Sequence, residues 1–223
     1  TSNGEFNNNK MTISGATAFN IARGNFALDD TSTADLKIDV IVQGGSNITK
    51  TGDGVLQLTR ANTYSGQTLL KEGTLLLTGA ATLGNGVGAV TLGGNGDACL
   101  TFAVDGDRTV GNAIGGTGTF TQKGSGIVTL GGANTYTGIT SVEAGTLKAG
   151  SATAFGTSSV SLSSGATLDI GDYALGNAVA VKAGASGALS TASIISNGGT
   201  LGSLTLGSYS RLNVDGSMAL ASG

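Results

Sequence analysis

The chain has 223 residues, with 40 Gly, no Pro, Trp or His, and a formal net charge of -3. Apolar residues make up 39% and charged residues 11%, which excludes a disordered chain, poor in apolar residues, and collagen, which needs abundant Pro. The 11 basic residues are scattered from Lys10 to Arg211, so nucleic acid and anionic membrane surfaces are not expected partners, because both require a basic patch.

Short β-strands joined by turns are predicted along the whole chain. Small and β-branched apolar residues are interleaved with Thr and Ser and interrupted by Gly, Asn and Asp every few residues, as in a chain of brief strands. The first clear alternation places Leu36, Ile38, Val40 and Val42 on one side. No apolar run approaches the ~20 residues of a membrane-spanning helix, so we expect no direct membrane insertion. Any export signal is expected upstream of residue 1.

The next elements form an internal repeat. Residues 52–77 (GDGVLQLTRANTYSGQTLLKEGTLLL) align without gaps on residues 124–149 (GSGIVTLGGANTYTGITSVEAGTLKA), with 12 of 26 positions identical. A degenerate echo follows near residues 198–216. We expect a structural role for the repeat-defining residues, which are Gly52, Gly54, Asn62, Tyr64, Gly66, Gly73, Gly124, Gly126, Asn134, Tyr136, Gly138 and Gly145.

Differences between the two copies indicate the side-chain directions. Gln57 becomes Thr129 while Leu58 stays Leu130, so alternate residues face inward and outward. The expected interior residues are Leu56, Leu58, Leu70, Leu75, Leu77, Val128, Leu130, Val142 and Leu147. Because one turn of such short strands cannot bury its apolar face alone, the coils must stack.

The predicted fold is therefore all-β, a right-handed parallel β-helix (solenoid). We expect a single segment over residues 1–223, with recurring units near 41–112 and 113–184 and degenerate coils over 185–223. Three coils per repeat give about 24 residues per coil and about nine coils in all.

The pattern GxGxLxLxxANTYxGxTxxxxGTLxx, present at 52–77 and, with Val128 in place of the first Leu, at 124–149, resembles the passenger-associated transport repeat of bacterial autotransporters. The resemblance implies a β-helical passenger that a type V secretion system displays on, or releases from, a Gram-negative cell. It also implies a C-terminal β-barrel translocator in the full-length protein, which these residues do not include. It implies no particular ligand.

Enzymatic chemistry is not expected. Without His, neither a Ser-His-Asp triad nor the commonest zinc ligand is available. Paired carboxylates could still cleave a polysaccharide, and the acidic groups to inspect are Asp29, Asp30, Asp35, Asp39, Asp97, Asp105 and Asp107. The alternative is that they lie on solvated turns, with Asp107 balancing the charge of Arg108.

Metal and cofactor sites are not expected either. GGNGDA at 93–98 departs from the calcium β-roll motif at Ala98, which leaves an incidental ion near Asp29 and Asp30 as the alternative. The Gly-rich residues 84–88 lack the following helix of a dinucleotide site. Cys99 alternates with Leu100, Phe102 and Val104, so we expect an outward, inert thiol.

The sequence thus favours a β-helical stalk that acts in adhesion to a host-cell or matrix surface, or in self-association. Two alternatives stay open: a scaffold that presents an enzyme or effector located elsewhere in the passenger, and a secretion or folding nucleus without its own ligand.

Overall fold

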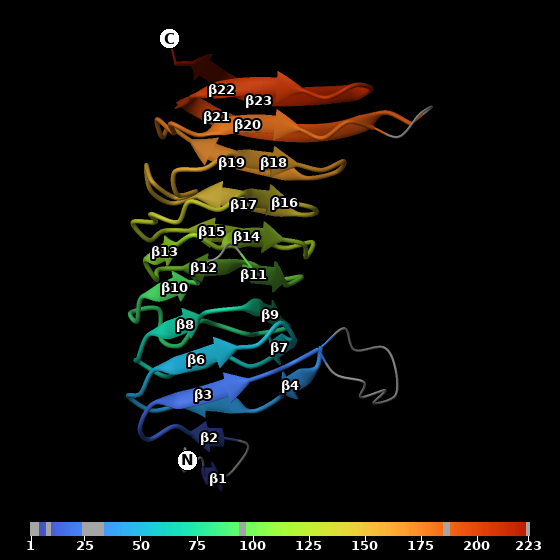
Figure 1. Cartoon of the computed structure of the whole chain (residues 1–223). Coiled ribbons are helices and arrows are strands. Elements are labelled where there is room, and N and C mark those ends of the chain that lie inside the picture. Colours follow the sequence, from blue (N-terminus) through green and yellow to red (C-terminus); the bar gives the residue numbers. More distant parts are fainter. Residues whose placement is uncertain (1–4, 8–9, 24–33, 94–96, 185–187, 222–223) are drawn as a thin grey trace.

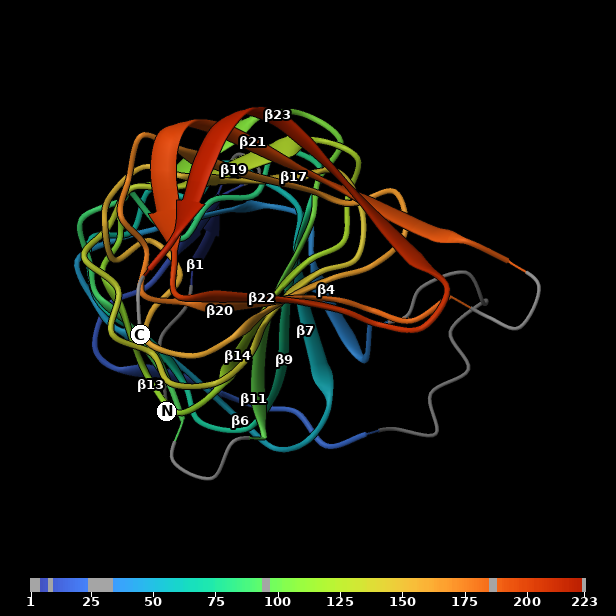
Figure 2. The same cartoon turned by 90° about the horizontal axis from the view of Figure 1, so that it is seen from above.

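The computed structural model describes residues 5–7, 10–23, 34–93, 97–184 and 188–221, which wind into a stack of short coils with the two ends of the chain at opposite ends of the stack (Figure 1). In Figure 2, seen from the C-terminal end, the chain runs counterclockwise as it rises toward the viewer. The coil is therefore right-handed, and the predicted all-β parallel β-helix is confirmed. Across the described ranges no helix has the length and apolar character needed to cross a membrane.

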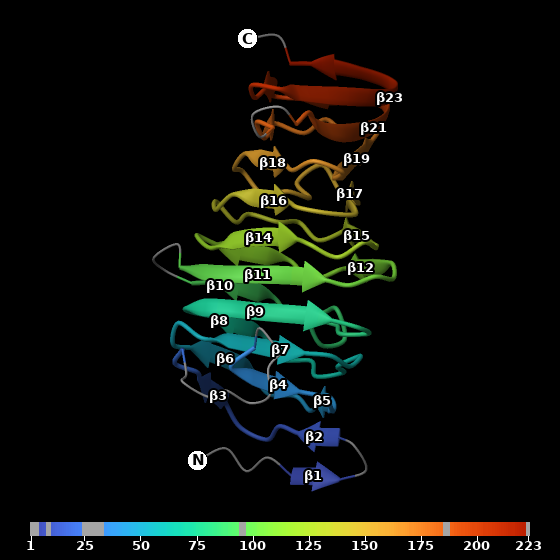
Figure 3. The ribbon, with the colours of Figure 1, turned by 90° about the vertical axis from the view of Figure 1, so that its right-hand side faces the viewer.

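Three parallel sheets run along the stack (Figure 3). The five-stranded sheet contains β3 (Thr17–Asn20), β6 (Ile48–Thr51), β8 (Thr68–Leu70), β10 (Val90–Leu92) and β13 (Ile114–Gly116). The nine-stranded sheet contains β4 (Leu36–Ile38), β7 (Val55–Leu58), β9 (Gly73–Thr78), β11 (Ala98–Ala103), β14 (Thr119–Gln122), β16 (Thr140–Val142), β18 (Val160–Leu162), β20 (Ala178–Val181) and β22 (Ser203–Leu206). The six-stranded sheet contains β12 (Arg108–Val110), β15 (Ile127–Leu130), β17 (Thr146–Ala149), β19 (Thr167–Gly171), β21 (Ser190–Leu201) and β23 (Ser210–Leu220).

The N-terminal end differs from the rest of the stack. There β1 (Glu5–Asn7) pairs antiparallel with β2 (Lys10–Thr12), and β2 pairs in parallel with β5 (Ile41–Gln43). The set of sheets also changes midway along the stack: the five-stranded sheet ends at β13, and the six-stranded sheet begins at β12. The molecule therefore has a switch point in the coil that contains β11, β12 and β13.

Most coils are shorter than expected from the sequence, although the expected number of about nine coils is confirmed by the nine strands that one sheet has among the described residues. Many hydrogen bonds between neighbouring coils join residues that are 20 positions apart. From β7, the nine-stranded sheet passes through β9 and β11 to β14, which is three full coils, before the chain reaches the second copy of the motif at β15. The expectation of three coils per repeat is therefore wrong, because the offset between the copies contains three coils and part of a fourth. The copies consequently lie on different sheets: β7 belongs to the nine-stranded sheet, but its counterpart β15 belongs to the six-stranded one.

The interior is apolar and continuous. All nine interior residues expected from the repeat are at most 2% exposed, and so are Leu100, Phe102 and Val104. Phe102, Phe120 and Tyr136 stack through the interior, with ring centroids 5.6 and 6.4 Å apart. The expectation fails at Leu36, which is 38% exposed and lies on β4, the end strand of the nine-stranded sheet, where no strand among the described residues precedes it. The unit bounds near 41–112, 113–184 and 185–223 stay a prediction.

Candidate functional site

The asparagine of each ANTY segment joins three consecutive coils. Asn62 is buried; its Oδ1 accepts the backbone N–H of Val42 at 2.9 Å, and its Nδ2 donates to the carbonyl of Thr82 at 3.0 Å. Asn134 repeats the arrangement with Ile114 at 2.8 Å and Ala154 at 2.6 Å. Each partner lies 20 residues before or after the asparagine. Both amides therefore satisfy buried backbone groups that the turning chain leaves outside its strand ladders.

The tyrosine of the same segment is buried and closes the corner. Tyr64 donates or accepts a hydrogen bond with Thr68 at 2.8 Å, and Tyr136 does so with Thr140 at 2.7 Å. Burial raises the pKa of Tyr64 to about 12 and raises that of Tyr136 as well, while the threonine hydroxyls oppose the shift. The phenols are thus held neutral and covered, which leaves no phenol surface for a ligand.

The repeated glycines lie where neighbouring coils touch backbone to backbone. A Cβ on Gly73 would lie 2.5 Å from the carbonyl oxygens of Gly52 and Gly54, and Gly145 has the same relation to Gly124 and Gly126. Gly73 and Gly145 also have positive φ angles of 66° and 63°, which a residue with a side chain rarely adopts. Gly66 and Gly138 likewise approach the backbone of the preceding coil, at Ser46 and Gly118.

A polar side chain just before each motif is buried as well. Lys50 is 1% exposed, and its Nζ donates to the carbonyls of Thr51, Gly52 and Glu72 at 3.1, 2.5 and 3.1 Å. At the equivalent position, Gln122 donates from Nε2 to the carbonyls of Gly124 and Gly126 at 2.9 and 3.1 Å. Burial lowers the pKa of Lys50. Both side chains donate hydrogen bonds to backbone carbonyl groups of a glycine turn. Gln122 shows that an uncharged donor can fill this position as well as the Lys50 ammonium does.

Most of the candidate carboxylates bind the following coil. Asp35 accepts the N–H of Val55 at 2.7 Å, and Asp107 accepts that of Ile127 at 3.2 Å. Asp105 accepts the Ser125 hydroxyl at 2.9 Å. Asp39 accepts the Thr59 hydroxyl and pairs with Arg60, and these contacts lower its pKa, with the Thr59 hydrogen bond as the largest cause. These carboxylates accept hydrogen bonds from the following coil, and they are not arranged as a pair of catalytic acid and base.

The expected charge balance between Asp107 and Arg108 is not formed. Among the described residues the ion pairs are Arg60–Asp39 and Lys148–Asp169. The Arg108 guanidinium instead donates to the backbone carbonyls of Asp107 and Gly79, at 2.7 and 2.6 Å. The two side chains point in different directions. The Asp107 carboxylate accepts the N–H of Ile127 on the next coil, whereas Arg108 lies on the same face of β12 as the buried Val110.

Asp97 lines an open hollow with Arg23, Asp53 and Glu72. Asp53 accepts the N–H of Arg23, and Glu72 accepts that of Gly52, each at 2.9 Å. Within the part of the chain that the structure describes, no three His, Cys, Asp or Glu side chains gather as a metal site. Asp29 and Asp30 lie outside the described residues, as do residues 94–96, which are half of the GGNGDA segment.

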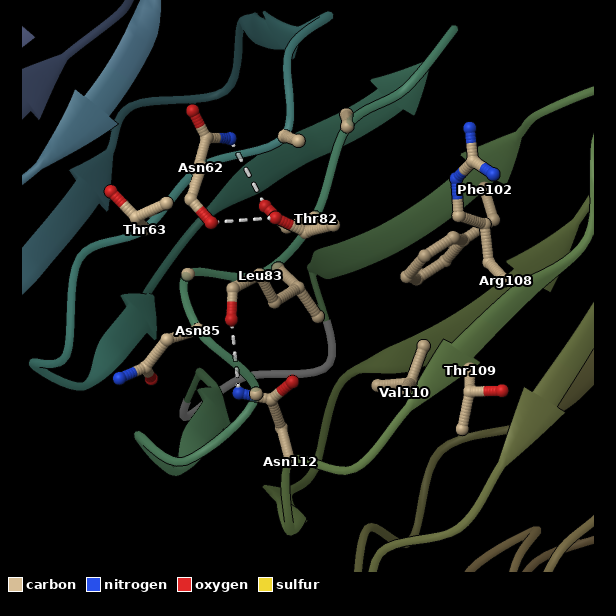
Figure 4. Close-up of a pocket in the computed structure, with 14 residues that line it drawn as sticks. Asn62, Thr63, Thr82, Leu83, Asn85, Phe102, Arg108, Thr109, Val110 and Asn112 are labelled. Carbon is tan, nitrogen blue, oxygen red and sulfur yellow. Dashed lines mark hydrogen bonds between the residues drawn. The ribbon is translucent and has the colours of Figure 1, made fainter.

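Cys99 is partly exposed on β11, and its Sγ lies 3.3 Å from the Thr101 hydroxyl, so the expected outward direction is confirmed. Gly84, Asn85 and Gly86, from the Gly-rich segment, line a cavity of about 230 Å³ beside β12 (Figure 4). At its edge Asn112 donates to the carbonyls of Leu83 and Gly88, at 3.1 and 2.7 Å. This cavity was not foreseen from the sequence.

The buried contacts made by Asn62, Tyr64 and their counterparts Asn134 and Tyr136 form what we call the corner network. Sequence reasoning missed two further pairs of residues that belong to it. Lys50 and Gln122 differ in identity, so a search for identical positions passes over them. Gly84 and Gly156 lie beyond the aligned segments, yet they occupy matching positions when the same alignment is continued. Their φ angles are 61° and 60°, and they approach the carbonyls of Tyr64 and Tyr136. Extending the alignment past residue 77 would have found the glycine pair.

Comparison with known proteins supports the repeat assignment. A family model described as the passenger-associated transport repeat matches residues 48–77 and 120–149. The adhesin BmaC autotransporter of Brucella suis biovar 1 (strain 1330) is 36% identical over 129 residues, which cover 52% of this chain and 4% of that relative. The chain thus matches a small fraction of the relative's length. No solved structure matches the chain significantly.

Proposed function

Because this chain belongs to the autotransporter passengers that carry passenger-associated transport repeats, surface-displayed or secreted by Gram-negative bacteria, we propose that it is an adhesive stalk segment without catalytic activity of its own. The stalk mediates attachment to a host-cell or matrix surface, or between passengers. The similarity to a protein named as an adhesin is the observation that carries this proposal. The full-length protein is expected to add a C-terminal translocator.

The geometry supports a binding surface rather than a reaction centre. The buried polar groups of the repeats are used to join coils, as Asn62 and Asn134 do. On the outside of the nine-stranded sheet, hydroxyl groups stand in register on three successive coils, at Thr121, Ser141 and Ser161. Such a row offers many weak hydrogen bonds along the stalk, which suits adhesion through repeated contacts.

The test is attachment of beads that carry the purified segment, scored on host cells, on matrix-coated surfaces and between beads. A double variant, Thr121→Lys with Ser141→Lys, alters the hydroxyl row. Its matched control, Thr146→Lys with Thr167→Lys, alters neighbouring outward positions on the six-stranded sheet. We expect attachment that the first variant loses and the control keeps. Wild-type beads that attach no better than uncoated beads would refute an adhesive role for this segment.

A second candidate function is a nucleus for folding during secretion. Within each motif the first strand pairs with the last, β7 with β9 and β15 with β17, across a single coil. Contacts between residues that are close in sequence form fast. Deleting residues 127–145 from the full-length protein removes one motif coil, and deleting residues 160–178 removes a coil of equal length outside the motif. Surface display should fall in the first deletion alone; equal display would reject the nucleus.

A further inference from the structure

The cavity beside β12 lies at the switch point of the solenoid. β12 is the first strand of the six-stranded sheet, and no described strand pairs with its other edge. Below it, residues 79–88 pass as an irregular segment, and the contacts that connect the two levels span 24 to 29 residues, against 20 for the bonds of Asn134. The wider coil leaves a seam between residues 79–88 and β12, which we call the seam cavity.

The seam cavity has an apolar floor and a polar rim (Figure 4). Leu83, Phe102 and Val110 supply buried apolar surface. Thr63, Asn85 and Thr109 are exposed around the opening. Its volume of about 230 Å³ is below the roughly 300–1,000 Å³ of pockets for drug-sized ligands. The space suits one small ring with both an apolar face and polar substituents.

Arg108 gives the seam cavity a positive charge. It carries the one charge among the described residues that line the cavity, and its guanidinium forms no ion pair with a described side chain. Two of its N–H groups donate to carbonyls, while the buried Nε has no hydrogen-bond partner. A partly covered guanidinium without a counter-ion is costly, so an anion beside it would be stabilised by charge-assisted hydrogen bonds.

We propose that the seam cavity binds a single carboxylated sugar residue, of the hexuronic or sialic acid type. One guanidinium matches one carboxylate in charge and planarity, whereas a phosphate dianion would need further positively charged side chains. The hydroxyls and amide at the rim match sugar hydroxyls, and the apolar floor matches the C–H face of a sugar ring. This site is independent of the proposed adhesive role, because it concerns ligand binding in solution.

The experiment is titration of the purified segment with glucuronate and N-acetylneuraminate, followed by saturation-transfer NMR and calorimetry. Glucose tests the need for the carboxylate, acetate tests the need for the ring, and sodium sulfate tests whether any anion suffices. Arg108→Gln removes the charge. Thr63→Trp blocks the rim, and Thr135→Trp is its matched control, because Thr135 occupies the same exposed motif position in the second repeat away from the cavity.

We expect one of the acidic sugars to bind more tightly than glucose, acetate or sulfate. Arg108→Gln and Thr63→Trp should weaken this binding roughly tenfold or more, while Thr135→Trp leaves it unchanged. Circular dichroism establishes that each variant is folded, and Thr63→Trp keeps the test decisive if Arg108→Gln unfolds. Acidic sugars that do not bind, that bind no better than acetate or sulfate, or that bind the Thr63→Trp and Thr135→Trp variants alike would overturn the proposal.

Discussion

Replacing Asn134 by Ala should lower the free energy of unfolding by much more than the loss of a few side-chain atoms suggests. The side chain satisfies two backbone groups, the N–H of Ile114 and the C=O of Ala154, on the coils to either side. Asn134 is 1% exposed, so water cannot readily take its place. An unpaired buried backbone group costs about 1–3 kcal/mol, and the two together imply about 2–6 kcal/mol.

The free energy of unfolding is measured by urea denaturation of the purified segment, monitored by circular dichroism. Because solenoids can unfold in parts, amide hydrogen exchange at Ile114 provides a local measure of the same bond. We expect a lower denaturation midpoint together with faster exchange at Ile114. Thr135→Ala is the control, since Thr135 is the exposed neighbour in the same ANTY segment, and its effect should stay within about 0.5 kcal/mol.

A loss below about 1 kcal/mol for Asn134→Ala, with unchanged exchange at Ile114, would refute the reasoning. It would mean that relaxation of the corner, or water, replaces the amide at little cost. Asn62→Ala provides a second, independent trial, because Asn62 forms the same pair of bonds with Val42 and Thr82. Agreement between the two variants would assign the effect to the motif rather than to one place in the stack.

Three further predictions follow from the corner network. Gly145→Ala should cost at least about 2 kcal/mol more than Gly165→Ala, measured by urea denaturation, because both have positive φ but a Cβ at Gly165 meets nothing within 4 Å, whereas one at Gly145 overlaps Gly124. Lys50→Gln should keep stability within about 1 kcal/mol, since Gln122 fills the equivalent place, while Lys50→Met, which cannot donate, should lose at least about 2 kcal/mol; equal losses would contradict the carbonyl-capping role. Because burial raises the Tyr64 pKa from 10.0 to about 12, the neutral phenol contributes about 3 kcal/mol that is fully present below pH 10 and lost as pH rises toward 12. Tyr64→Phe should make that alkaline decline in unfolding free energy smaller by about the Tyr64 contribution, while the decline due to Tyr136, whose pKa burial also raises, remains. A decline of unchanged size would show that Tyr64 does not contribute to it.

The interior of the fold was predictable because the sequence contains the same coil twice. Substitutions such as Gln57 to Thr129 mark outward positions, and retained residues such as Leu58 and Leu130 mark inward ones. The corner tyrosines are buried, and the structural role expected for the repeat-defining residues stays a prediction. Strand alternation is a local property, so it survives in short segments of sequence.

Coil length was not predictable, because it depends on which strands stack rather than on the spacing of the repeat. The offset between the two copies suggests a whole number of coils, yet successive coils differ in length: Leu56 stacks on Leu75 in one step, and Leu75 stacks on Leu100 in the next. The buried Lys50 was missed for a related reason: a charged residue at an inward position contradicts the pattern unless its three carbonyl partners are known.

The rotation between the two motifs limits what the repeat itself can encode. The counterparts of β7 and β8 lie on different sheets from the originals, while the hydrogen bonds of Asn62 and Tyr64 recur unchanged at Asn134 and Tyr136. The motif therefore specifies a corner and its three coils, not a face of the rod. A flat surface for a partner, or a seam such as the one beside β12, needs residues outside the repeated pattern, such as Arg108, in addition to motif residues such as Thr63. Specificity should be sought in the residues outside the pattern.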